Sequence, residues 1–572
     1  MGDDVGPLGT LSELQRTGRL TGKVGSVPVV VFWHEGRAWA LEDRCPHMGF
    51  PLRQGTLEAG MVTCHWHHAR FDLATGCTLD LFADDARGFD VLVERGEVVV
   101  VARDHADVAE HLWRRLDDGL EEGISLVVAK AVLGLLDGGA PAVDIVRRGL
   151  EFGTRYRGAG WGAGLTVLVA MANLLPSLDP DDRALALVHG LSFVSRDTRG
   201  RPPRFAIRGF EGRPDPSRLA GWYRRFVGTR SGDAAERVLT TALAGEVELP
   251  DVERTMFAAV TDHVFVDGGH TLDFTNKAFE TLELVGPASA IDVLPTLVQQ
   301  TASARWSEEG GTWRHPHDLV GIVADAEAEL PEALAAGERL AGSFDDVAGA
   351  AHGILADEPS AVVGSVLGAA RAGATPEQLG RALAYAAALR ISRFHVRNDH
   401  GDWDTVHHAF TAANALHHAL QRAPSIELHR GLVHGALRVY LDRFLNVPAA
   451  RLPDDTSGDL ADLEACWDLQ GQVDRAGAIV VGHLREGGDP DAVVAVLAHA
   501  LLQEDAEFHW YQVVEAGVRQ SQAWPRGSEE RTVVLGAVAR FLAAHTPTRR
   551  ELPRVVDIAD RLRRGDALHE EA

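Results

Sequence analysis

Two short segments, each pairing a cysteine with a histidine, constrain this chain more than any other feature. The first is Cys45-Pro46-His47 and the second is Cys64-His65-Trp66-His67. Thiolates and imidazoles together suit transition metals, and an iron–sulfur centre can use two thiolates on one iron and two imidazoles on the other. A zinc finger groups its two cysteines in one segment and its two histidines in another, whereas here each segment has one of each. The pattern therefore predicts a one-electron iron–sulfur centre, with chance spacing as the alternative.

The residues around these segments predict a small β-domain. Residues 24–33, which are rich in β-branched side chains, and residues 37–42 predict two strands. His34-Glu35-Gly36 joins them, which predicts a hairpin. Residues 70–76 predict a strand that enters a turn, and residues 98–101 predict the second arm of a closing hairpin. Such a domain can hold two metal-binding loops tip to tip.

Residues from about 1 to 104 resemble the Rieske ferredoxins and the Rieske domains of bacterial oxygenases. The resemblance implies an all-β fold and a [2Fe–2S] cluster held by Cys45, His47, Cys64 and His67. In this family the imidazole-bound iron lies nearest the surface, which implies that electrons leave on the side of the two histidines. His68 stands where the family usually has glycine, so we expect it to line the docking face and not to bind iron.

The same resemblance predicts a low reduction potential. Respiratory Rieske proteins carry an extra cysteine in each loop, and this chain has Phe50 and Trp66 at those positions. They also place serine and tyrosine hydroxyls near the second loop, where these donors raise the potential. Ala69 and Phe71 stand there in this chain and have no hydroxyl to donate. We therefore expect a midpoint near the bottom of the Rieske range of roughly −150 to +300 mV.

The bulk composition bounds the partners and the compartment. The chain has 572 residues and a net charge of −26, from 82 acidic and 56 basic residues, which predicts binding neither to nucleic acid nor to an anionic membrane. Cys77 and Cys466 are the only cysteines outside the motif, so we expect free thiols and a reducing cytoplasm. The N-terminus does not resemble a signal peptide, and the apolar stretch 161–175 is too short to span a membrane. No nucleotide motif follows a strand, so the electron donor is expected to be a separate reductase or ferredoxin.

From about residue 105 the pattern becomes helical. Apolar residues recur every three to four positions up to residue 572, which predicts roughly twenty helices. The predicted fold class is therefore multidomain, with an N-terminal all-β Rieske fold (residues 1–104) followed by a large all-α multi-helix domain (residues 105–572). If the helical part divides into two subdomains, we expect the break near the Pro- and Gly-rich loops 199–216 or 447–458.

Two histidine-containing segments of the helical region suggest a second metal. His400, Asp404 and His407 have helical i, i+4 and i+7 spacing, and Thr411, Asn414 and His418 extend the same face. His263, Asp267 and His270 repeat the spacing, although Gly268-Gly269 interrupts any helix there. Two imidazoles and one carboxylate leave open positions on an iron and suit non-haem Fe(II) that must bind oxygen. The alternative is that these polar stripes only pack or face solvent.

The segment 404–444 resembles the questin-oxidase-like helical proteins, which are linked to oxidation of aromatic polyketides. The Asp/Glu-x-x-His-x4-His motif of ordinary Rieske oxygenases is missing from the sequence. Two hypotheses follow. In the first, the cluster feeds electrons to a catalytic metal site at His400, Asp404 and His407, or at His263 and His270, where an oxygenase uses O2 on a small organic substrate. In the second, the chain is a non-catalytic electron carrier or redox sensor with a helical docking scaffold.

Overall fold

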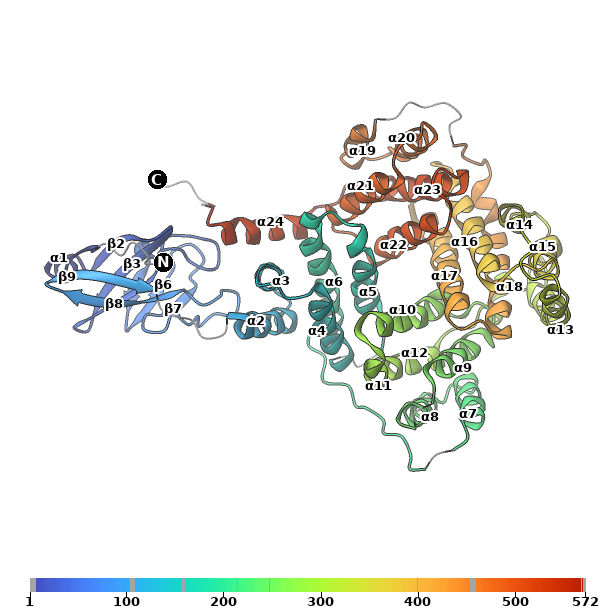
Figure 1. Cartoon of the computed structure of the whole chain (residues 1–572), viewed down its shortest axis with the longest axis horizontal. Coiled ribbons are helices and arrows are strands. Elements are labelled where there is room, and N and C mark those ends of the chain that lie inside the picture. Colours follow the sequence, from blue (N-terminus) through green and yellow to red (C-terminus); the bar gives the residue numbers. More distant parts are fainter. Residues whose placement is uncertain are drawn as a thin grey trace. The chain divides into compact units, whose positions relative to one another are not determined.

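Contacts between residues divide the chain of this computed structural model into two compact units. Unit 1 comprises residues 1–142 and 552–572, and unit 2 comprises residues 143–551. The structure describes residues 7–102, 108–156, 160–212, 214–245, 247–398, 400–452, 459–566 and 568. The chain has an N-terminal β-rich Rieske-type domain followed by a large helical region (Figure 1), as the sequence predicts.

The main sheet of unit 1 is antiparallel, with strand order β1-β9-β8-β4-β3-β2. Its strands are β1 (Gly9–Thr10), β2 (Arg19–Val24), β3 (Val27–His34), β4 (Arg37–Glu42), β8 (Gly88–Glu94) and β9 (Glu97–Ala102), with helix α1 (Leu11–Thr17) after β1. The hairpin predicted at residues 34–37 joins β3 to β4, and its turn residues Glu35 (φ 49°) and Gly36 (φ 80°) are left-handed. Two positive φ angles in succession match the twist of the flanking strands.

Strand β3 is apolar on both faces because each face borders a separate core. Val29 and Val31 pack into one cluster, whereas Val30 and Phe32 pack into the other. The second cluster lies against a three-stranded sheet made of β5 (Thr56–Glu58), β6 (Met61–Thr63) and β7 (Arg70–Asp72), with the short helix η1 (Leu52–Gln54) before it. Cys45 and Cys64 belong to this core, so the folding of the β-domain buries both thiols together.

Three helices group with the β-domain in unit 1. They are α2 (Val108–Glu122), α3 (Ser125–Asp137) and α24 (Glu551–Arg564). Arg115 on α2 donates to the Asp84 carboxylate (2.9 Å) and to the Ala83 carbonyl (3.0 Å), both in the loop before β8. Unit 1 therefore contains two helices that precede unit 2 in the sequence, α2 and α3, and one that follows it, α24. The domain boundary predicted at about residue 104 falls within residues 103–107, which lie outside the described part.

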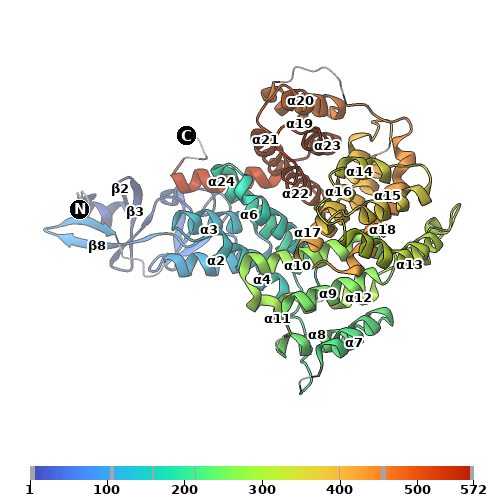
Figure 2. The ribbon, with the colours of Figure 1, turned by 45° about the vertical axis from the view of Figure 1, so that its right-hand side comes forward.

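In its described residues, unit 2 consists of helices joined by loops and contains no strand (Figure 2). Its longer helices are α4 (Ala142–Arg155), α5 (Ala163–Leu174), α6 (Arg183–Thr198), α7 (Pro216–Gly228), α8 (Gly232–Ala244), α9 (Leu249–Thr261), α10 (His270–Val285), α13 (Leu319–Glu338), α14 (Val347–Ile354), α15 (Pro359–Arg371), α16 (Pro376–Ser392), α17 (Trp403–Arg422), α18 (Ile426–Leu441), α20 (Val473–Arg485), α21 (Pro490–Leu502), α22 (Phe508–Gln522) and α23 (Glu529–His545). Short helices are α11 (Ala290–Val293), α12 (Val298–Ser303) and α19 (Glu464–Trp467).

Helices α10, α17 and α22 lie side by side in the interior of unit 2 and position the site considered below (Figures 1 and 2). Helix α5 packs against α10 and α22 and is buried at nearly every position, which its almost wholly apolar sequence permits. Neither predicted subdomain break, 199–216 or 447–458, coincides with the boundary between the two units. In the described part of the chain, none of the helices combines the length and the apolar character needed to cross a membrane.

Candidate metal centres

The two cysteine–histidine loops of unit 1 have the same backbone conformation. In each loop, the cysteine N–H donates to the carbonyl five residues ahead, and the cysteine carbonyl accepts from the N–H four residues ahead. These bonds are Cys45 N to Phe50 O (2.8 Å), Gly49 N to Cys45 O (2.7 Å), Cys64 N to Ala69 O (2.8 Å) and His68 N to Cys64 O (3.0 Å). The β-domain therefore presents two matching loops, one after β4 and the other after β6.

His68 occupies the position in the second loop that Gly49 occupies in the first. Both residues are left-handed, with φ of 62° and 78° respectively. For a residue with a Cβ this conformation costs roughly 1–2 kcal/mol, which explains why glycine is favoured there. The His68 side chain is exposed. Its role in docking stays a prediction.

Both thiols are buried between the loops and accept backbone hydrogen bonds. The N–H groups of His47 and Met48 donate to the Cys45 sulfur, and those of Trp66 and His67 donate to the Cys64 sulfur. A thiol–thiol hydrogen bond raises the pKa of Cys45, with burial adding to it, and the same bond lowers the pKa of Cys64 to about 6. Backbone N–H donors stabilise thiolates and suit cysteines that hold a metal.

The two imidazoles lie outside the thiols. The rings of His47 and His67 are 4.7 Å apart between centroids and nearly perpendicular, at 88°. Burial lowers the pKa of His47 to about 4, and the neighbouring His67 and Lys130 add to the effect, so this ring is neutral and able to bind a metal. Its Nδ1 is buried and has no hydrogen-bond partner among the described residues. Two buried sulfurs and two outer imidazoles fit a [2Fe–2S] cluster with mixed ligands.

Charged side chains fix the first loop from two directions. The buried Asp43 carboxylate accepts from Arg53, both from its backbone N–H (2.7 Å) and from its guanidinium (2.6 Å). Lys130 of α3 donates to the carbonyls of Pro46 and His47, the latter at 3.1 Å, and pairs with Asp84 at 3.2 Å. A helix beyond the β-domain therefore places a cation on the backbone of a cluster-binding loop.

The His400–Asp404–His407 stripe predicted in the helical region is only partly placed. His400 begins the short turn η9 (His400–Asp402), and its side chain lies outside the described part. The Asp404 carboxylate is 60% exposed, whereas the His407 ring is fully buried, and their nearest O and N atoms are 3.8 Å apart. The coordination of a metal by these three residues stays a prediction.

The second predicted segment separates into two environments. His263 stacks on Trp306 with ring centroids 3.5 Å apart, and its Nδ1 bonds to the Glu308 carboxylate at 2.8 Å. His270 begins α10 directly after Gly268-Gly269, so the glycines interrupt the helix as the sequence predicts. The His270 ring meets the rings of His408 (4.6 Å between centroids) and His509 (5.2 Å).

Four histidines from three helices gather at this point, and we refer to His270, His407, His408 and His509 as the histidine cluster. The His407 ring is 4.2 Å from the His408 ring and 4.0 Å from the His509 ring, between centroids. Each of the two predicted segments therefore contributes one residue to the histidine cluster, His407 from the first and His270 from the second. Burial lowers the pKa values of all four, to about 2 for His408 and about 4 for His509, so the rings are neutral.

Polar side chains continue from the histidine cluster into the core of unit 2. The Gln512 amide bridges His509 Nδ1 (3.2 Å) and the buried Asp273 carboxyl. One turn further, Lys277 donates to Glu280 (2.9 Å) and Glu515 (2.8 Å). Burial raises the pKa of Asp273 to about 7, and the positive charge of Lys277 opposes this effect. The charge of Lys277 is paired with those of Glu280 and Glu515, as buried charges must be.

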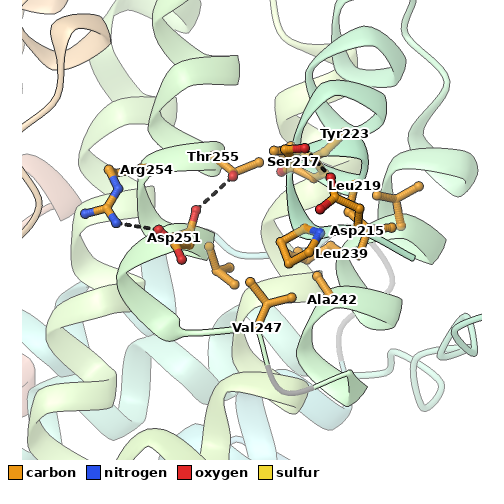
Figure 3. Close-up of a pocket in the computed structure, with 14 residues that line it drawn as sticks. Asp215, Ser217, Leu219, Tyr223, Leu239, Ala242, Val247, Asp251, Arg254 and Thr255 are labelled. Carbon is orange, nitrogen blue, oxygen red and sulfur yellow. Dashed lines mark hydrogen bonds and ion pairs between the residues drawn. The ribbon is translucent and has the colours of Figure 1, made fainter. Parts of the chain in front are cut away.

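A separate cavity of about 450 Å³ lies between α7, α8 and α9 (Figure 3). Leu219, Leu239 and Val247 supply apolar lining, and the Asp251 carbonyl accepts from the Thr255 hydroxyl at 2.8 Å. None of the predicted site residues and none of the histidine cluster lines it. Its lining also includes the charged residues Asp215, Asp251 and Arg254, so the cavity is of mixed character and separate from both candidate metal centres.

Sequence reasoning missed His408, Gln512 and Lys130 as site residues. The signal for α22 was present, because His509, Gln512, Glu515 and Arg519 recur at three- to four-residue spacing in a helix that is otherwise apolar. His408 directly follows a residue that was predicted, yet it faces the cluster as well. Lys130 has no local signal, because the cluster-loop carbonyls to which it donates, those of Pro46 and His47, are more than eighty residues away.

Comparisons with known proteins agree with the loop geometry. Residues 5–86 match the family model "Rieske [2Fe-2S] domain". The chain is 35% identical to apoptosis-inducing factor 3 of Mus musculus over 85 residues, which are 15% of this chain and only 14% of that protein. It is 33% identical to ferredoxin CarAc of Metapseudomonas resinovorans over 88 residues, 14% of this chain and 78% of the ferredoxin.

A further match is 46% identity to the 4beta-methylsterol monooxygenase of Methylococcus capsulatus over 43 residues, 8% of this chain and 12% of that enzyme. All three matches are short relative to this chain, and the family model ends at residue 86, before the helical region. With two matching loops, two buried thiols and two outer imidazoles, and with a ferredoxin as a relative over most of its length, the chain belongs to the Rieske [2Fe–2S] family through its N-terminal domain.

Proposed function

We propose that this protein is an iron–sulfur oxidoreductase that takes single electrons from a separate reductase or ferredoxin and supplies them to a metal centre in unit 2. The observation that carries the proposal is the pairing of buried thiols with outer imidazoles on two matching loops. Cys45 and Cys64 would hold one iron, and His47 and His67 the other. When bound, a [2Fe–2S] cluster of this kind carries one electron at a time.

The cysteine ligands and the histidine ligands of such a centre would differ in their exposure to solvent. The sulfurs are almost fully excluded from solvent, which protects them from oxidation and exchange. His67 and Trp66 are exposed, so a partner protein can approach the imidazole side closely. This arrangement supports the expectation that electrons pass through the histidine edge of the domain.

An oxygen-dependent reaction on a small organic substrate is the finer part of the proposal. One relative is named as a monooxygenase and another as a ferredoxin, which links the domain type to oxidation chemistry. In unit 2, the neutral and partly exposed rings of His270, His408 and His509 can bind an ion and leave room for a further ligand. The family model ends at residue 86, so this part rests on the chemistry of these residues alone.

The second candidate function is an electron carrier or redox sensor in which unit 2 serves as a docking scaffold. One observation favours it: the Asp404 side chain is 60% exposed, so the predicted carboxylate is open to solvent although its nearest oxygen lies 3.8 Å from the buried His407. In that case the polar residues of unit 2 would serve folding only, as the fully paired Lys277 group does.

Anaerobic reductive titration of the iron-loaded full-length protein separates the two functions. A cluster alone accepts one electron per chain, so a second redox metal raises the count to two. We expect two electrons for the wild type and one for His408→Ala, with the cluster's paramagnetic signal unchanged in both. The matched variant Cys64→Ser should lose the cluster's electron and its signal. If the wild type and His408→Ala each accept only one electron per chain, the result contradicts a second redox metal and supports the electron-carrier function.

A further inference from the structure

Three of the clustered histidines converge closely enough to share one ion. Their nearest ring nitrogens, on His270, His408 and His509, all lie within 4.8 Å of one another. They come from α10, α17 and α22, so packing of three helices sets their positions. Imidazole ligands at about 2.1 Å from one ion are about 3.0–3.4 Å apart. Binding therefore requires the ring nitrogens to approach one another by at most about 1.8 Å, which side-chain rotation can supply.

The hydrogen bonds of Gln512 determine which nitrogen of His509 is free. The Gln512 Nε2 donates to the Asp273 carboxyl, which turns its Oε1 toward His509 Nδ1 at 3.2 Å. An amide oxygen can only accept, so His509 Nδ1 carries the proton and Nε2 keeps its lone pair. A donor bond from the far nitrogen to an oxygen acceptor is the usual support of a metal-binding histidine.

The cluster also has buried nitrogens that nothing in the described residues satisfies. His408 Nε2 and both nitrogens of His407 are buried without a hydrogen-bond partner there. Leaving a buried polar atom unpaired costs about 1–3 kcal/mol, so several together in one place indicate a missing ligand. Neutral imidazoles, which burial favours here, are the form that binds a metal.

From these observations we infer that His270, His408 and His509 bind one divalent first-row transition-metal ion in unit 2, with Gln512 and Asp273 positioning His509. Three nitrogen ligands suit Fe2+, Co2+, Ni2+, Cu2+ or Zn2+ and do not suit Mg2+ or Ca2+, which require oxygen. All three residues are partly buried, and three imidazoles leave further coordination positions on the ion. This site is the second centre on which the proposed function rests, and it differs from the predicted His400–Asp404–His407 set.

Cobalt binding to the full-length protein tests the site without any electron transfer. The protein is treated with chelator under conditions that retain two irons per chain, equilibrated with Co2+, desalted and analysed by plasma mass spectrometry. We expect one cobalt per chain, with iron unchanged. His408→Ala and His509→Ala should each lose the cobalt, and Gln512→Leu should weaken its affinity by about 10–100-fold. His263→Ala and the double variant His400→Ala/Asp404→Ala are matched controls and should keep it.

X-ray absorption at the cobalt edge gives a readout that needs no variant. Three imidazole nitrogens at about 2.1 Å support the site, whereas sulfur scattering would place cobalt in the cysteine loops and overturn it. Absence of bound cobalt, or equal loss in the control variants, also overturns it. If cobalt binds as expected while the iron-loaded protein accepts only one electron, the site stands and the proposed electron transfer fails.

Discussion

Individual buried residues of unit 2 show how the interior tolerates charge. Lys277 is 1% exposed, and its two carboxylate partners, Glu280 and Glu515, are equally buried. Asn173 donates to both carboxylates at 2.9 Å, and Arg519 pairs with both as well. The two carboxylates are therefore satisfied by side chains from three helices, α5, α10 and α22, and the stability of the group depends on every member being present.

Removal of the Lys277 charge should destabilise unit 2 strongly. In Lys277→Met the two carboxylates keep Arg519 but lose their second cation, and breaking a buried pair costs about 3–5 kcal/mol. Arg371→Met is the matched control, because it breaks an exposed pair with Glu329 whose contribution is about 0–1 kcal/mol. Urea unfolding followed by far-UV circular dichroism measures both. Equal small shifts of the two midpoints would contradict this account of the buried group.

At the scale of elements, the spacing of residues within a segment predicted its secondary structure but not the elements against which it packs. The β3–β4 hairpin and the interruption before α10 follow from residues within a few positions of each other. Helical spacing also predicted the face of α17 that carries His407. That face meets α10 and α22 only through long-range packing, which single-segment spacing does not encode. Asp404 shows the limit, since it lies one turn before His407 at the edge of the stripe and faces solvent.

Helix α3 offers a test of how an added element tunes the cluster. Lys130→Gln removes a cation near the His47 backbone and leaves Asp84 with Arg115 as its remaining ion-pair partner. The loss of this positive charge disfavours the more negative reduced state. A unit charge at about 10 Å with an effective dielectric of about 20 is worth about 1.7 kcal/mol, or about 70 mV for one electron. With solvent screening, we expect the midpoint to fall by a few tens of millivolts, from a wild-type value near −150 mV. Lys23→Gln, at an exposed position of β2, should leave it unchanged, and potentiometric titration followed by paramagnetic resonance compares the three proteins. An unchanged midpoint in Lys130→Gln would show that the charge does not reach the cluster.

For the whole molecule, the notable property is that the first and last described parts of the chain belong to one unit. Residues 552–566 belong to the unit that contains the β-domain, although all of unit 2 precedes them in the sequence. In α24, Val556 and Ala559 are buried, and a Leu562 methyl lies 3.0 Å from the position that a Cβ on Gly49 would occupy. The first cluster loop is thus covered by residues from the other end of the sequence, which no local pattern could have predicted.

Truncation after Glu551 tests whether this cover belongs to the Rieske unit. If α24 is part of unit 1, its removal exposes the loop that carries Cys45 and His47, and water and oxygen reach the ligands more readily. We expect the visible absorbance of the cluster to decay several-fold faster in air. Truncation after Asp566, which keeps α24, is the control and should behave as the full chain. If α24 has no part in protecting the cluster of the domain predicted at residues 1–104, both truncated proteins should retain the cluster as long as the full chain does.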